Sequence, residues 1–142
     1  MKSNSAGILI ENTRHEILLG HATGNKHWDI PKGKYDKSDH ILIKTALRET
    51  QEETGLVFSK NNLIFVASCY FNSEKNMTLY KLNSKIPYGA LSLDRLRCSS
   101  MVKRAKYNQF PEIDNYKWFT KEEVLNNVSK SMYKFLITNG VL

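Results

Sequence analysis

Residues 48–55, Arg-Glu-Thr-Gln-Glu-Glu-Thr-Gly, restrict the structure more than any other part of the sequence, because they predict the end of a helix with three glutamates on one face. At about 100° per residue, Glu52 lies about 60° to one side of Glu49 and Glu53 about 40° to the other. Like charges at this spacing destabilise a helix, and the helix dipole disfavours them near Gly55, the expected C-cap. A bound cation would offset both costs, and clustered carboxylates are the hard ligands that Mg²⁺, Mn²⁺ or Ca²⁺ prefers.

The helix is predicted over residues 41–54, with Ser38 or Asp39 as its N-cap. A solvated acidic face is the competing interpretation of the three glutamates, and the helix alone would favour it. The loop before the helix favours a ligand site instead. Gly33 lets the backbone approach a bound ion or phosphate closely, and Lys32 can supply a positive charge to a phosphate chain.

The rest of the chain combines strand patterns with two further helices. Strands are predicted at residues 6–10, 16–21, 63–70, 77–82 and 116–119, with the first two joined as a hairpin. A capping box at residues 120–123 opens one helix, and residues 129–138 form another. Residues 86–109 predict a long basic loop with a short strand or helix. Its basic residues are Arg95, Arg97, Lys103, Arg104 and Lys106. This order predicts an α+β domain and excludes a helical bundle or a pure β-barrel.

Length and composition fit one soluble domain over residues 1–142. The apolar fraction of 41% and the charged fraction of 25% argue against disorder. Two cysteines, Cys69 and Cys98, are too few for a disulfide framework and favour a reduced, cytoplasmic setting. No apolar run approaches the ~20 residues of a membrane helix, so no membrane partner is expected. The net charge of +7 favours anionic partners such as nucleotides, polyphosphates or nucleic acid.

Residues 33–56 resemble the Nudix box, whose family pattern is G-x5-E-x7-R-E-U-x-E-E-x-G-U, where U is aliphatic. The R-E, E-E and G-U pairs of this pattern are all present. Residues 28–33 (Trp-Asp-Ile-Pro-Lys-Gly) and 112–118 (Glu-Ile-Asp-Asn-Tyr-Lys-Trp) resemble the branch of the family that hydrolyses diadenosine polyphosphates asymmetrically. The resemblance implies a Nudix-like α/β/α sandwich with a mixed β-sheet, the loop and helix of the box, and C-terminal helices.

Two departures from the pattern concern the loop of the box. Fifteen positions lead from Gly33 to Arg48, where the family pattern has fourteen. The first glutamate of the pattern, which mainly braces the loop against the helix in the family, is absent. Asp39 or His40 takes its place, depending on where the extra residue lies. Asp39 could brace the loop with a shorter reach, whereas His40 could not do so as an anion.

The resemblance also implies a role for each matching residue. The implied metal ligands for Mg²⁺ or Mn²⁺ are the carboxylates of Glu49, Glu52, Glu53 and Glu112 and one backbone carbonyl, that of Gly33 or Lys32. The candidates for the catalytic base are Glu49, Glu52 and Glu112. Arg48 would assist catalysis by anchoring Glu49 through a charge-assisted hydrogen bond. Lys32 would grip a phosphate of the substrate, and Tyr116 would contact a base.

The expected function is therefore that of a divalent-metal-dependent pyrophosphohydrolase acting on a nucleoside diphosphate-linked substrate. Dinucleoside polyphosphates such as diadenosine tetraphosphate are the first choice. The basic residues between 95 and 106 leave RNA 5′ ends as an alternative substrate, with diphosphoinositol polyphosphates as another. A Nudix-like module that senses nucleotides without hydrolysis is the non-enzymatic alternative. The intact Arg-Glu and Glu-Glu pairs argue for the enzyme, since a sensor need not keep metal ligands.

Overall fold

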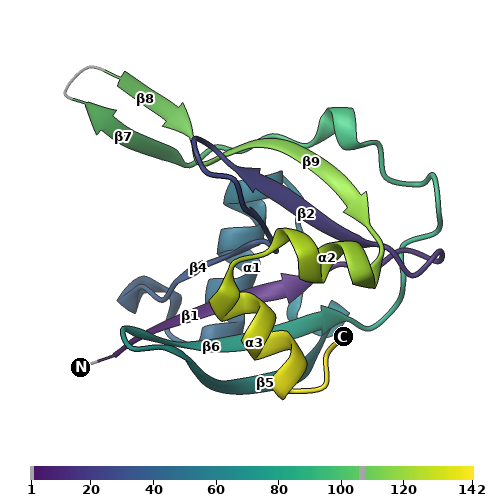
Figure 1. Ribbon diagram of the computed structural model, residues 1–142, viewed down its shortest axis with the longest axis horizontal. Coiled ribbons are helices and arrows are strands. Elements are labelled where there is room, and N and C mark those ends of the chain that lie inside the picture. Colours follow the sequence, from purple (N-terminus) through teal and green to yellow (C-terminus); the bar gives the residue numbers. More distant parts are fainter. Residues whose placement is uncertain (1, 106–107) are drawn as a thin grey trace.

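Strands from both halves of the chain build two sheets that lie between helices (Figure 1). In the computed structural model, which describes residues 2–105 and 108–142, the strands are β1 (Ser3–Leu9), β2 (Ile17–Ala22), β3 (Trp28–Asp29), β4 (Lys32–Lys34), β5 (Leu63–Asn72), β6 (Lys75–Leu82), β7 (Met101–Ala105), β8 (Asn108–Pro111) and β9 (Ile113–Phe119). The α-helices are α1 (Leu42–Thr54), α2 (Lys121–Asn127) and α3 (Lys130–Thr138), and the 3₁₀ turns are η1 (Lys37–Asp39), η2 (Lys60–Asn62) and η3 (Leu93–Arg95).

The larger sheet is mixed and has the order β4-β1-β6-β5, because β1 pairs parallel to β6 and antiparallel to β4. The smaller sheet, β3-β2-β9, is antiparallel. Strands β7 and β8 form a hairpin that extends away from the body (Figure 1). The mixed sheet, with α1 on one side and α2 and α3 on the other, confirms the predicted α+β sandwich.

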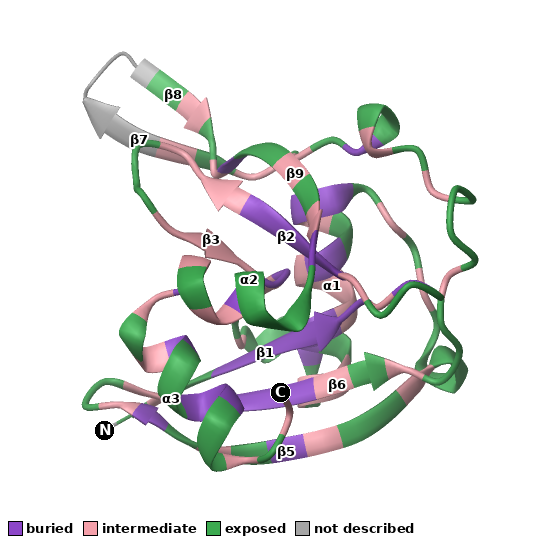
Figure 2. Ribbon diagram, turned by 45° about the vertical axis from the view of Figure 1, so that its right-hand side comes forward, coloured by how far each residue is buried: buried purple, intermediate pink, exposed green. Residues whose placement is uncertain are grey.

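Strand β1 is buried on both faces beyond its first residues (Figure 2). Ala6 and Ile8 join Ala46 of α1 in one apolar core, whereas Leu9 joins Leu136 of α3 in the other. Successive side chains of a strand point to opposite faces of its sheet. One central strand therefore contributes to both cores and fixes α1 and α3 on opposite sides.

The predicted hairpin of β1 with β2 is confirmed only near its turn. A bridge between Glu11 and Ile17 and a 2.9 Å hydrogen bond from the Leu18 N–H to the Ile10 carbonyl join the two segments there. Beyond that point β1 enters the larger sheet and β2 the smaller one. Both strands are apolar on both faces, and a two-stranded hairpin alone could not cover so much apolar surface.

The helix ends correct one prediction and confirm others. Helix α1 begins at Leu42 after Ile41, so neither Ser38 nor Asp39 is its N-cap. Both residues belong instead to η1, where Asp36 and Asp39 form a capping box of their own. At the other end, the C-cap is Gly55 as predicted, with φ of 80°.

The two C-terminal helices follow the sequence pattern closely. The capping box that opens α2 is present, with Thr120 and Glu123 bonded to each other's backbone N–H groups. In α3, the buried side chains are Met132, Phe135 and Leu136. Among the described residues, no helix is long and apolar enough to cross a membrane.

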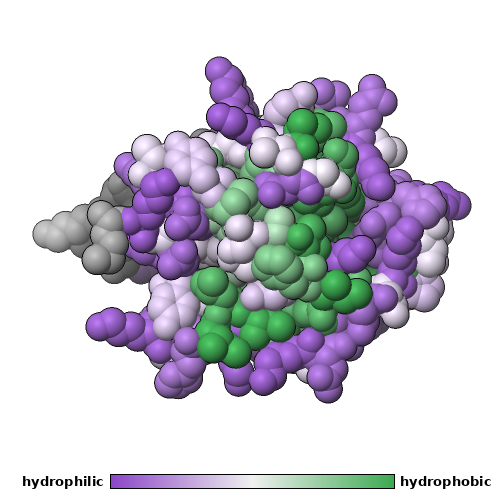
Figure 3. Space-filling view, turned by 90° about the horizontal axis from the view of Figure 1, so that it is seen from below, coloured by the Kyte–Doolittle hydropathy of each residue, from purple (hydrophilic) through white to green (hydrophobic). Residues whose placement is uncertain are grey.

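Apolar side chains gather on the lower face of the molecule (Figure 3), the side on which β5 and α3 lie in Figure 1. Exposed apolar residues on these two elements include Ile64, Phe65 and Ile137. Strand β5 is an edge strand, and its ladder with β6 is interrupted at two irregularities. Bulges of this kind are one way in which edge strands avoid pairing with other chains.

Candidate active site

Arg48 of α1 binds three carboxylates at once. Its guanidinium donates hydrogen bonds to both oxygens of Asp39 (2.7 and 3.0 Å), to Glu49 (2.9 Å), to Glu52 (3.2 Å) and to the Lys34 carbonyl (3.0 Å). Asp39 is only 5% exposed. The hydrogen bonds from Arg48 hold the pKa of the Asp39 carboxyl well below its usual range. Asp39 therefore ties the loop to the helix, which is the bracing role left open by the missing glutamate.

His40 accommodates the extra residue of this loop. Its φ of 68° and ψ of −50° are unusual for a residue with a side chain. The Ile41 N–H donates to the Asp39 carbonyl at 2.8 Å, which closes a three-residue turn around His40. This is the rare and strained form of the γ-turn. Because the turn follows Asp39, that residue keeps the sixth position after Gly33, where the family pattern has its glutamate.

The carboxylate of Glu49 lies against the backbone of Gly33. A Cβ at residue 33 would lie 2.0 to 2.4 Å from the three atoms of this carboxylate, so the close approach requires glycine. Burial raises the pKa of Glu49, the guanidinium of Arg48 lowers it, and the charges of Glu52 and Glu112 raise it further. The fold thus brings Glu112 into electrostatic range of α1 from a distant part of the sequence.

Glu53 turns away from Arg48 and toward β4. Its side chain accepts a hydrogen bond from the Lys32 N–H at 3.1 Å, and the residue is 7% exposed. Burial raises the pKa of Glu53 to about 9. The positive charge around this carboxylate does not compensate for its burial, and a bound cation would favour its ionised form.

Lys32 forms an ion pair with Asp29. The Lys32 Nζ lies 3.2 Å from Asp29 Oδ2. The charge of Asp29 is the main reason why the pKa of Lys32 is raised, so the ammonium stays charged. Sequence reasoning singled out Lys32 and missed Asp29. The available signal was the opposite charge three positions before Lys32.

A hollow of about 290 Å³ opens beside Glu53. Asp29, Lys32 and Glu112 line it together with Val102 at the base of the β7–β8 hairpin. The hollow therefore brings the Lys32 ammonium and several carboxylates to a wall that also has apolar parts. Such a wall suits a phosphate-bearing ligand that arrives with a cation.

Comparison of the sequence with known protein families identifies the family of this chain. The family model of the NUDIX domain matches residues 1–138. The chain belongs to the Nudix family. The resemblance seen in the acidic helix and its glycine loop is thereby confirmed.

Relatives of this Nudix chain show how far the similarity extends. An uncharacterized 17.7 kDa protein of Enterobacteria phage T4, in the e-segB intergenic region, is 26% identical over 144 residues, which cover 96% of this chain and 94% of that protein. The asymmetrical bis(5′-nucleosyl)-tetraphosphatase of Rattus norvegicus is 50% identical over 52 residues, which cover 36% of this chain and 35% of the rat enzyme. The matched segment thus spans about a third of that enzyme's length.

A solved structure supports the fold. The crystal structure of a C. elegans Ap4A hydrolase binary complex has a TM-score of 0.63 and 21% identity, and the match covers 98% of this chain and 96% of that chain. Family membership and the local similarity to the rat tetraphosphatase place the chain among the hydrolases of phosphorus-containing anhydrides.

Nudix hydrolases generally use divalent metals, and the donor chemistry of this site fits such an ion. Carboxylate oxygens are hard ligands, and the positive charge near the buried Glu53 carboxyl does not offset the effect of its burial. Across residues 2–105 and 108–142, however, no three acidic, histidine or cysteine side chains gather as a metal site. Arg48 engages Glu49 and Glu52, while a backbone N–H of β4 engages Glu53. The predicted ligand set stays a prediction.

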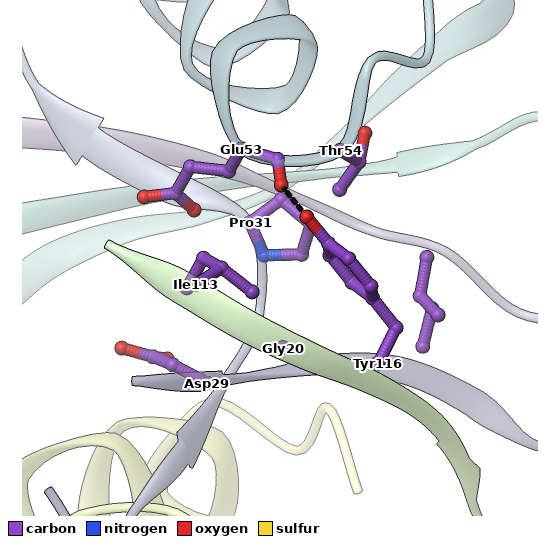
Figure 4. Close-up of a pocket in the computed structure, with 8 residues that line it drawn as sticks. Gly20, Asp29, Pro31, Glu53, Thr54, Ile113 and Tyr116 are labelled. Carbon is purple, nitrogen blue, oxygen red and sulfur yellow. Dashed lines mark hydrogen bonds between the residues drawn. The ribbon is translucent and has the colours of Figure 1, made fainter. Parts of the chain in front are cut away.

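Tyr116 of β9 contacts the last turn of α1 in this Nudix fold. Its hydroxyl donates a hydrogen bond to the Glu53 carbonyl (Figure 4). Its ring lines a narrow crevice with Pro31 and Ile113. Burial raises the pKa of the Tyr116 hydroxyl, which therefore stays protonated and able to donate. Contact between Tyr116 and a substrate base stays a prediction, and the contact that the geometry shows is with the helix.

Proposed function

We propose that this Nudix protein is a Mg²⁺- or Mn²⁺-dependent pyrophosphohydrolase that cleaves a phosphoanhydride bond in a nucleoside diphosphate-linked substrate. A dinucleoside polyphosphate such as diadenosine tetraphosphate is the proposed substrate. The hollow beside α1 carries this proposal, because Lys32 lines it together with Glu53 and Glu112. The 50% identity to the rat tetraphosphatase over 52 residues supports the substrate class.

Hydrolysis adds one water across the P–O–P linkage. The water oxygen joins one phosphorus, and the bridging oxygen leaves with the other phosphate. A divalent ion held by Glu49, Glu52 and Glu53 would neutralise the anionic linkage and acidify a water. Lys32 attracts a phosphate group into the hollow. A carboxylate, that of Glu49, Glu52 or Glu112, accepts the proton that the water loses.

Arg48 supports this chemistry without touching the substrate. Its bonds to Glu49 and Glu52 hold both side chains on one face of α1, and its bonds to Asp39 fix the guanidinium itself. Charge-assisted bonds of this kind are shorter and stronger than neutral ones. The candidate bases on the helix are therefore held in place before a substrate arrives.

Turnover of diadenosine tetraphosphate with Mg²⁺ tests the proposal. The Glu52→Gln variant should lose about 100-fold or more in turnover, while its thermal unfolding midpoint stays close to that of the wild type. Glu122→Gln, at an exposed position of α2, is the matched control and should keep full turnover. Unchanged turnover in Glu52→Gln would refute the assignment.

Product analysis by mass spectrometry in ¹⁸O water identifies the substrate and the phosphorus attacked. The panel should contain dinucleoside polyphosphates, capped RNA, nucleotide sugars and inositol pyrophosphates. The proposal expects the fastest cleavage with a dinucleoside polyphosphate. A nucleotide sensor would bind one of these compounds and release no product.

The position of the β7–β8 hairpin favours RNA 5′ ends as a second candidate substrate. The hairpin extends from the body (Figure 1), and Val102 at its base lines the hollow. Of the basic residues in this part of the sequence, Lys106 lies outside the described residues, and only the backbone is described for Lys103 and Arg104. An RNA that follows the hairpin should be bound with a steep dependence on salt. Salt-independent binding of a 5′-triphosphorylated RNA would exclude this candidate.

A further inference from the structure

The C-terminal end of α1 is held by a segment from a distant part of the chain. We call this segment, residues 97–100, the tether. The N–H groups of Arg97 and Ser99 donate to the carbonyls of Thr54 (3.1 Å) and Glu52 (2.7 Å), and the Ser99 hydroxyl adds a second bond to Glu52 at 3.2 Å. The two N–H groups that face the helix are thus those of Arg97 and Ser99, two residues apart.

The tether completes the hydrogen bonding of the helix end. The last carbonyls of an α-helix have no partner within the helix. In α1, the Gly55 N–H bonds the Gln51 carbonyl at 2.8 Å, and the Tyr116 hydroxyl bonds the Glu53 carbonyl. With the bonds from Arg97 and Ser99 of the tether, each carbonyl from Gln51 to Thr54 has a partner. The acidic end of α1 is thus fixed against the tether and β9.

The other end of the tether binds the backbone of Glu112. The Glu112 N–H donates to the Ser100 carbonyl at 2.9 Å, and the Thr23 N–H donates to the Glu112 carbonyl at 2.9 Å. Glu112 lines the hollow beside Glu53. Two backbone hydrogen bonds on adjacent tether residues therefore connect α1 to the remote carboxylate.

We propose that the tether positions Glu112 relative to the carboxylates of α1 and thereby sets the rate of hydrolysis. This inference rests on the proposed function, because the placement of Glu112 matters only if Glu112 takes part in the reaction. A misplacement of about 1 Å at a catalytic group can cost on the order of 100-fold in rate. Loosening the tether should therefore lower kcat by about 10-fold and leave KM within about 2-fold.

The Ser99→Pro variant breaks the connection at one point. Proline has neither a backbone N–H nor a hydroxyl, so both bonds from residue 99 to the Glu52 carbonyl are lost, while the hollow keeps all of its lining residues. Ser92→Pro in the same loop is the control, because Ser92 is exposed and its φ of −83° is close to that of proline. We expect Ser99→Pro to lose about 10-fold in kcat and Ser92→Pro to keep wild-type kcat.

A double-mutant cycle with Glu112→Gln separates positioning from general loosening. If the tether acts through Glu112, the losses in kcat caused by Ser99→Pro and by Glu112→Gln do not multiply in the double variant. Ser99→Pro should then cost about 10-fold in the wild type and less than about 2-fold in the Glu112→Gln background. Equal losses in both backgrounds would overturn the proposal.

Hydrogen exchange of the Glu112 amide gives a readout that needs no substrate. Exchange should become faster in Ser99→Pro, and to a smaller degree in Ser99→Ala, which loses only the hydroxyl bond and stands in if the proline variant does not fold. Unchanged exchange and unchanged kcat in the folded variants would contradict the proposal. If the wild type hydrolyses no member of the panel, the proposed function fails, and the exchange rates still decide whether the tether places Glu112.

Discussion

Asp39 and Arg48 form a two-point ion pair across the one-residue insertion of the Nudix box, with Oδ1–Nε and Oδ2–Nη2 distances of 2.7 and 3.0 Å. Aspartate is one methylene shorter than the glutamate of the family pattern. Asp39 belongs to the capping box of η1, and its shorter side chain still reaches Arg48. The Thr45 hydroxyl adds a third bond to the same carboxylate at 2.8 Å.

The Asp39→Asn variant should be less stable than the wild type. Removing one partner of a fully buried ion pair costs about 3–5 kcal/mol. Arg48 is 32% exposed and keeps its ion pairs with Glu49 and Glu52 in the variant. We therefore expect the free energy of unfolding to fall by about 1–3 kcal/mol. Urea unfolding measures this loss. Asp94→Asn, at an exposed position, is the control and should change the free energy of unfolding by less than about 0.5 kcal/mol.

The contribution of Asp39 should disappear in acid. The hydrogen bonds from Arg48 hold the pKa of Asp39 in the folded protein below its ordinary value of 3.8, so the unfolded chain takes up a proton first as the pH falls. The stabilisation is complete above the unfolded pKa, and it is lost progressively as the pH falls from about 4 toward the folded pKa. The difference in unfolding free energy between the wild type and Asp39→Asn should therefore shrink between pH 5 and about pH 3. A difference that is constant over this range would contradict the assigned ion pair.

The sequence predicts those parts of the fold that local patterns determine. The Thr120 capping box, the Gly55 C-cap and the buried side of α3 are all where the pattern places them, because caps and helical spacing act within a few residues. The parting of β1 from β2 was not predicted. Which strands pair over long distances depends on the packing of whole layers, which alternation within one strand does not encode.

The same limit applies to the candidate site. The box identifies Glu49, Glu52 and Arg48, because their spacing on one helix is fixed by helical geometry. The sequence pattern of the box does not predict that Glu53 turns toward β4 or that Asp29 pairs with Lys32. These contacts depend on how β4 lies against α1, and so on the pairing of β4 with β1.

The strain at His40 predicts a stabilising substitution. Glycine adopts positive φ without steric cost, and unusual backbone conformations cost about 1–3 kcal/mol. Glycine also increases the entropy of the unfolded chain, which offsets about 0.4–1 kcal/mol of the stabilisation gained by relieving the strain. His40→Gly should therefore raise the free energy of unfolding by about 1 kcal/mol.

Ile41→Gly is the matched control for His40→Gly. Ile41 is 50% exposed and has an ordinary φ of −133°, so glycine relieves no strain there and should destabilise the protein. Thermal and urea unfolding of both variants measure the effects. Equal destabilisation by both substitutions would mean that His40 is not strained.

The contact between Gly33 and Glu49 predicts a substitution that impairs activity more than stability. In Gly33→Ala, the new Cβ would meet the Glu49 carboxylate at 2.0–2.4 Å. The atoms met are the far end of a flexible side chain, so Glu49 can move aside at a small cost in stability. Its displacement should lower turnover by on the order of 10- to 100-fold and raise the Mg²⁺ concentration needed for half-maximal activity.

Gly89→Ala is the control for Gly33→Ala, because Gly89 has φ of 84° with open space around its Cβ position. That variant should lose about 1 kcal/mol of stability and keep its turnover. Steady-state kinetics with a Mg²⁺ titration and urea unfolding of both variants make the comparison, and wild-type turnover in Gly33→Ala would show that the position of Glu49 does not matter.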